Sequence, residues 1–208
     1  MSMHRRLMMS KIPDNEIWYR AAEKVTLYTS TGVVSHEFAN GKGVITFANR
    51  VASVGQQLRG TAITDVELPS GVTSIGNHAF NGCTSLALTS LPSGVTIIGD
   101  SAFRGCTNLA LTSLPSGVTS IGQYVFSGCT SLALTSLPSG VTSIGNYAFS
   151  GCTAIQSLTI PIIEPPTLGG SVFFGTTFSI YVPAESVDTY KAAQNWSTYA
   201  SRIFPITN

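Results

Sequence analysis

The side chains that could do chemistry are few, and only the cysteines are regularly spaced. They are Cys83, Cys106, Cys129 and Cys152, each 23 residues after the one before. Three interpretations are open. A buried thiol ladder needs only a corner where small apolar side chains pack well. A disulfide needs neighbouring strands about 5 Å apart. A metal site is least supported, because the sequence has no Cys-x-x-Cys and no histidine pair, so we expect no metal and no cofactor.

Acid–base side chains are isolated from one another. The histidines are His4, His36 and His78, and none has a second ligand at metal spacing. Between residues 68 and 163 the charged side chains are Asp100 and Arg104 alone. Glycoside hydrolysis usually needs two carboxylates a few ångströms apart, so a β-helix polysaccharide enzyme has no support here. No glycine-rich loop indicates nucleotide binding. We predict no catalytic residues and a protein that is not an enzyme.

A repeat of 23 residues determines where these side chains lie. Near-identical copies occupy residues 68–90, 91–113, 114–136 and 137–159, and weaker copies occupy 51–67 and 169–183. A fixed period of this length is typical of a solenoid, in which each coil buries its apolar face against the next. The sequence therefore predicts about six coils.

Each copy predicts two short strands separated by turns. Leu-Pro-Ser-Gly has turn chemistry, and the Val-Thr-Ser-Ile that follows it is β-branched. Ile-Gly bends the chain, Ala-Phe points inward over a helical or 3₁₀ turn, and Gly-Cys-Thr makes the next corner. A second strand is expected to begin at Leu86. Because identical positions stack in register, one phenylalanine from each copy should form an internal column: Phe80, Phe103, Phe126 and Phe149.

The repeat resembles the BspA-like leucine-rich repeat family. The resemblance rests on AF-x-G-C-x-x-L and L-P-x-x-V-x-x-I-G, here Ala79-Phe80, Gly82-Cys83, Leu86, Leu91-Pro92, Val95 and Ile98-Gly99. It covers roughly residues 44–208, including a C-terminal stretch like the closing segment of such proteins. It implies a curved leucine-rich repeat solenoid, mainly β with short helical or 3₁₀ turns. It also implies attachment to host or matrix proteins from the bacterial surface.

The chain divides into four predicted regions. Residues 1–14 are expected to be a flexible N-terminus, 15–48 a β-rich cap, 49–183 the solenoid and 184–208 a C-terminal cap. Asn40-Gly41 predicts a hairpin turn in the first cap. In the second cap, Trp196, Tyr199 or Phe204 should pack on the last coil. The sequon that begins at Asn195 is assigned no function.

Composition limits the partners and the location. The chain is 43% hydrophobic and 10% charged with a net charge of +1, which argues against disorder and gives no basic face for nucleic acid. No stretch is apolar enough to insert into a membrane, and no signal peptide is visible. The family resemblance implies a cell-surface or secreted protein, and a cytoplasmic location stays open.

Two sets of side chains are candidates for ligand binding. The middle copies read Leu-Ala-Leu-Thr-Ser-Leu where the flanking copies have apolar residues at the first, fourth and sixth places. If the register is kept, Leu88, Leu111 and Leu134 point outward as an apolar stripe bordered by the outward Asp65. The alternative is a bulge that turns these leucines into the core.

The second set occupies one repeat position, that of His78, Tyr124 and Tyr147. This position is either an aromatic binding stripe or a partly packed edge.

These observations favour a non-catalytic binding scaffold of the adhesin type. Its partner would be a protein or a glycan, contacted through the solenoid surface. The alternative function is a structural or self-assembly module, because near-identical coils with little charge and exposed strand edges invite pairing into a homo-oligomer.

Overall fold

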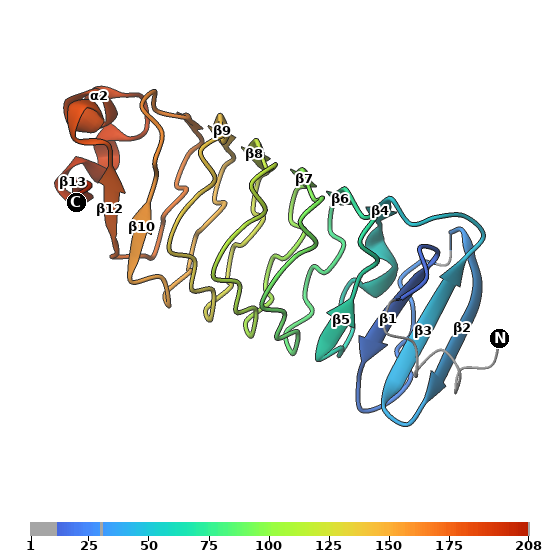
Figure 1. The fold of residues 1–208 in the computed structure, drawn as a ribbon. Coiled ribbons are helices and arrows are strands. Elements are labelled where there is room, and N and C mark those ends of the chain that lie inside the picture. The colour runs from blue at the N-terminus through green and yellow to red at the C-terminus, as the bar shows by residue number, and fades with distance from the viewer. Residues whose placement is uncertain (1–11, 30, 208) are drawn as a thin grey trace.

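The chain folds into an elongated stack of coils, closed at one end by an antiparallel sheet and at the other by helical turns (Figure 1). The computed structural model describes residues 12–29 and 31–207. Most of the predicted flexible N-terminus, residues 1–14, therefore lies outside the described residues.

The N-terminal sheet has four strands in the order β2-β3-β1-β5. Every neighbouring pair in it is antiparallel. Asn40 and Gly41 connect β2 to β3 with φ angles of 52° and 74°, so the predicted hairpin turn is confirmed. β5 belongs to the first coil, and its pairing with β1 joins this sheet to the stack. The strands are β1 (Glu16–Arg20), β2 (Val33–Ala39), β3 (Lys42–Phe47) and β5 (Asp65–Glu67).

The Val-Thr-Ser-Ile segments form one side of the stack as a six-stranded parallel sheet, in the order β11-β9-β8-β7-β6-β4. Each strand is only two residues long, because the coil turns immediately after it. In the four regular copies the isoleucine at the strand's second place is at most 2% exposed. The strands are β4 (Ser53–Val54), β6 (Ser74–Ile75), β7 (Ile97–Ile98), β8 (Ser120–Ile121), β9 (Ser143–Ile144) and β11 (Thr167–Leu168), and the 3₁₀ turn η1 (Gln56–Leu58) follows β4.

The predicted phenylalanine column runs through the core. Rings in neighbouring coils are stacked, with centroids 5.3, 5.8 and 5.5 Å apart from Phe80 to Phe149. The column continues to Phe173 of the last coil, 5.9 Å further on. All five rings are at most 1% exposed. Parallel stacking of large rings supplies contact that a single coil could not make alone.

The glycine after each strand sets how closely the coils approach. A Cβ added at Gly145 would lie 2.7 Å from the backbone nitrogen of Gln123 in the preceding coil, and the contacts at Gly99 and Gly169 are as tight. A side chain there would therefore force neighbouring coils apart, because the obstacle is backbone.

The second predicted strand forms only in the flanking copies. Besides β5, it appears as β10 (Ser157–Thr159) and β12 (Ser179–Val182), which form a parallel sheet with β13 (Ile203–Pro205). The strand expected to begin at Leu86 is absent from the middle copies, where the chain stays irregular.

Side-chain orientation also differs between the middle and the flanking copies. Leu88, Leu111 and Leu134 are 8%, 0% and 1% exposed, so the outward stripe is wrong and these leucines belong to the core. Thr89, Thr112 and Thr135 beside them are exposed. The middle copies therefore turn inward at the first, third and sixth places, whereas the flanking copies turn inward at the first, fourth and sixth. The alternation thus changes where a middle copy meets a flanking copy, and a regular ladder does not cross such a change.

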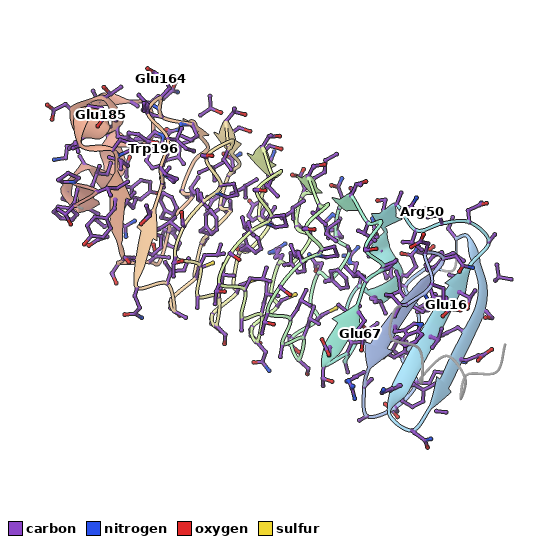
Figure 2. The ribbon with its side chains drawn as sticks, viewed as in Figure 1. Glu16, Arg50, Glu67, Glu164, Glu185 and Trp196 are labelled. Carbon is purple, nitrogen blue, oxygen red and sulfur yellow. The ribbon has the colours of Figure 1, made fainter. Side chains whose placement is uncertain are left out.

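The C-terminal cap covers the last phenylalanine of the column. Trp196 is 1% exposed, with its ring centroid 6.1 Å from that of Phe173 and 4.9 Å from that of Tyr190 (Figure 2). Tyr199 meets Phe173 edge-on at 5.1 Å, whereas Phe204 remains 42% exposed. The cap is built from η2 (Ala184–Ser186), α2 (Val187–Ala192) and η3 (Ser197–Arg202).

Candidate binding groove

The four cysteines are free and fully buried. Three of them donate a thiol hydrogen bond to a phenylalanine carbonyl in the preceding coil: Cys106 to Phe80 (3.0 Å), Cys129 to Phe103 (3.0 Å) and Cys152 to Phe126 (3.1 Å). Cys83 donates in the same way to Leu58, at 2.9 Å. Burial raises the pKa of every one of these thiols, that of Cys152 to about 12. Since the thiolate is the reactive form, this ladder is structural and unreactive at neutral pH.

Threonines extend the thiol ladder at both ends. Thr61 stands at the cysteine position of the first coil and donates to the Leu58 carbonyl at 2.6 Å. Thr176 does so in the last coil, donating to the Phe173 carbonyl at 2.7 Å. Each threonine donates to the carbonyl three residues earlier in its own coil, whereas each cysteine donates to a carbonyl of the preceding coil. Among the described residues, no group of three or more His, Cys, Asp or Glu side chains could hold a metal ion.

The aromatic candidates occupy one repeat position, in the turns that follow the six-stranded sheet. His78, Tyr124 and Tyr147 all have left-handed backbone, with φ between 55° and 58°. The two tyrosine rings stack with centroids 5.0 Å apart and planes 4° apart, and the Arg104 guanidinium lies 5.3 Å from the Tyr124 centroid. Tyr124 and Tyr147 are packed on one another and still partly exposed, so this position has features of both sequence interpretations, whereas the His78 ring lies near the Asn81 amide. None of the three histidine and tyrosine candidates borders the groove described next.

A hollow lies between β5 and the irregular segment of the next coil, and we call it the β5 groove. Its volume is about 750 Å³, within the usual range for a ligand site. Of the predicted apolar stripe, only Leu88 borders it, at 8% exposure. In the part of the chain that the structure describes, no aromatic side chain lines it. The lining residues are Ile12, 64–68, Ser70 and 87–93.

The interrupted ladder creates the β5 groove. The Ala87 amide donates to the Thr64 carbonyl at 2.9 Å, but within the described part of the chain no hydrogen bond joins residues 88–91 to β5. At the opposite flank the equivalent segment of the last middle copy is hydrogen-bonded to β10. The Leu137 amide donates to the Thr159 carbonyl, and the Thr159 amide donates to the Thr135 carbonyl, both at 2.9 Å. The chain therefore separates from the regular sheet on the β5 side and not on the β10 side.

The charges at the β5 groove are both negative. Asp65 and Glu67 are the ionisable side chains in its lining, and they stand two residues apart on one face of β5 while Val66 between them is buried. Asp65 accepts a hydrogen bond from the Val66 amide at 2.8 Å and lies 3.9 Å from Arg20, in an exposed and therefore weak ion pair. Figure 2 shows Glu67 on β5, at the end of the stack away from Glu164 and Glu185.

Comparison with known proteins identifies the repeat. The model of the BspA type leucine rich repeat region matches residues 52–179 in six copies. The chain belongs to the BspA-type leucine-rich repeat family. Its coils, parallel ladder and buried apolar positions are those of a leucine-rich repeat solenoid, as the sequence predicted.

Two solved bacterial structures are similar to this BspA-type protein. A leucine-rich cell surface protein of Faecalibacterium prausnitzii is 30% identical with a TM-score of 0.50; the match covers 79% of this chain and 48% of that one. A leucine-rich repeat protein of Bacteroides ovatus is 20% identical with a TM-score of 0.31, over 73% of this chain and 62% of that one. The BspA-type chain thus spans about half the length of the Faecalibacterium protein. No curated protein matches it.

The described residues contain no helix that is both long enough and apolar enough to cross a bilayer.

Sequence reasoning found the outward Asp65 but missed the groove beside it. The signal that was available is the change from the 1-4-6 to the 1-3-6 apolar pattern between residues 63–68 and 86–91. That change marks where two neighbouring coils differ in strand register, and the chain separates from the sheet at one of the two such places.

Proposed function

We propose that this BspA-type protein is a non-catalytic binding scaffold of the bacterial cell surface, an adhesin that recognises a protein through the β5 groove. The observation that carries the proposal is the groove itself, a hollow of about 750 Å³ between β5 and the irregular segment of the next coil. The Faecalibacterium relative, named as a cell surface protein, supports the location.

The lining of the groove favours a protein over a glycan. It consists of backbone, Ser and Thr hydroxyls, aliphatic side chains and two carboxylates. Backbone and hydroxyl groups provide hydrogen bonds for a polypeptide, while Val66, Leu68 and Leu91 provide apolar contact. The flat ring of an aromatic residue, which would stack against a sugar, is missing from the lining.

The structural or self-assembly alternative is less well supported, because the outer edges of both end sheets are blunted. Edge strands invite pairing unless they are bent, short or covered. In β2 the register shifts between Val33 and Ser35, and Lys24 donates to the His36 carbonyl at 2.7 Å. At the other end β13 has three residues and ends at Pro205, which has no amide hydrogen to offer.

An array of matrix proteins and glycans, probed with the full chain, tests the proposal. Thr89→Trp places a large ring at the lip of the groove, because Thr89 is exposed and lines it. Thr112→Trp is the matched control, at the same repeat position one coil further on and outside the lining. We expect a protein ligand that loses at least tenfold in affinity with the first variant and keeps it with the second. Equal binding by both variants, or a glycan ligand alone, would contradict the proposal.

A further inference from the structure

We infer that the β5 groove takes an extended, basic polypeptide segment from a partner protein, which adds to the open edge of β5 as a strand. The inference rests on the proposed binding function and names the class of partner. It starts from the position of β5 as the last strand of its sheet, paired with β1 on one side only. An edge strand directs one row of amide and carbonyl groups away from its neighbour.

The space beside this edge suits a single added strand. The groove follows residues 64–68, which as five extended residues span roughly 16 Å at about 3.3 Å each. Its far wall is the segment 88–91, whose backbone has no hydrogen bond to β5 in the described chain. The Thr64 carbonyl already accepts from Ala87, and the Val66 amide already donates to the Asp65 carboxylate. An added strand would therefore have to displace the Asp65 contact to pair with the Val66 amide, and it would gain the backbone hydrogen bonds that supply affinity in strand addition.

The negative charge of the groove indicates which side chains the added strand should carry. Asp65 and Glu67 lie on the same face of β5, two residues apart, and no cationic side chain among residues 12–29 and 31–207 is part of the lining. Side chains on an added strand alternate in direction, so basic residues at every second place would stand opposite both carboxylates. Small apolar residues at the intervening places would face the aliphatic lining from Val66, Leu68 and Leu88.

The probe is a fluorescein-labelled peptide of four Lys-Val units, with binding to the full chain followed by fluorescence anisotropy. Asp65→Asn/Glu67→Gln removes both charges while keeping the shape and the acceptor for the Val66 amide. We expect this variant to bind about 2- to 30-fold more weakly, the range for two exposed ion pairs. Glu164→Gln/Glu185→Gln removes two exposed carboxylates at the other end and should bind as the unmodified chain does. Equal loss in both variants, or none in either, would overturn the inference.

Two N-methylated peptides separate strand addition from charge attraction. In one all valine amides are methylated, and in the other all lysine amides, so each blocks one edge of the strand without altering its charge. At least one should lose tenfold or more in affinity. If both bind as the unmethylated probe does, there is no strand addition. If the array ligand depends on Thr89 while the Lys-Val probe does not bind, the proposed function stands and this inference fails.

The chain's own basic residues are the competing occupant. Arg5, Arg6 and Lys11 precede Ile12, which lines the groove. Changing all three to Gln should leave the affinity for the probe unchanged when the site serves an external partner. A several-fold rise in affinity would instead identify the N-terminal residues as the occupant and overturn the inference.

Discussion

The buried thiol ladder makes the stability of the fold sensitive to mild alkali. Burial raises the pKa of all four thiols above the unfolded value of about 8.5, so each folded thiol stays protonated where the unfolded one ionises. The stabilising effect is complete below about pH 8.5 and is lost as the pH rises through the interval up to the folded pKa. We therefore expect the free energy of unfolding to fall with pH across that interval.

The magnitude follows from ionisation of the unfolded chain. At pH 9.5 an unfolded thiol with a pKa of about 8.5 gains about 1.4 kcal/mol from losing its proton, so Cys106, Cys129 and Cys152 together give about 4 kcal/mol, and Cys83 adds to this because its pKa is also raised. This is a large part of the roughly 5–15 kcal/mol that stabilises a typical domain. Lysine and tyrosine titrate mainly above pH 10 and contribute little in this window.

Urea unfolding followed by circular dichroism, at pH 7.5 and pH 9.5 with a phosphine reductant, measures the effect. Cys129→Ser keeps a donor at the position that bonds to the Phe103 carbonyl and should reduce the loss by about a quarter to a third. Changing all four cysteines to Ser should remove most of it. Equal stability of the unmodified chain at both pH values would refute the reasoning, as would an unchanged loss in the fourfold variant.

Three further predictions concern packing and backbone. Leu111→Ala should lower the free energy of unfolding by about 2–5 kcal/mol, because the side chain is fully buried, whereas Thr112→Ala should change it by less than about 0.5 kcal/mol in the same urea titration. Ser171→Gly should raise Tm by about 1–4 °C in calorimetry, because φ is 54° there, while Ser131→Gly at an ordinary φ should lower it. Truncation before Ala184 should give an aggregated or unfolded product by light scattering; a soluble folded one would show that the cap is dispensable.

The sequence was sufficient to predict the repeating part of the fold. Phe80, Phe103, Phe126 and Phe149 occupy one repeat position, and in a stack of identical coils they can only lie above one another. The hairpin at Asn40-Gly41 was predictable for a different reason, since few residue pairs accept two positive φ angles.

The direction of Leu88 could not be decided from the sequence, because it depends on contacts between coils. A leucine and a threonine are adjacent, and either could face inward with one change of register. The β5 groove was still harder to predict from the sequence. It requires β5 to pair with β1, a partner more than forty residues earlier, and the hydrophobic pattern contains no information on that pairing.

The tight glycine contacts between coils determine how the solenoid can change in length. Because the same backbone contact recurs at Gly99, Gly122 and Gly145, each regular coil accepts any other as its neighbour. A 23-residue unit added to or removed from the regular coils would therefore produce no junction that the protein does not already contain. The β5 groove is formed by the first coils and the N-terminal sheet, so it would keep its lining. The length of the solenoid can thus change in steps of one coil while the groove stays the same.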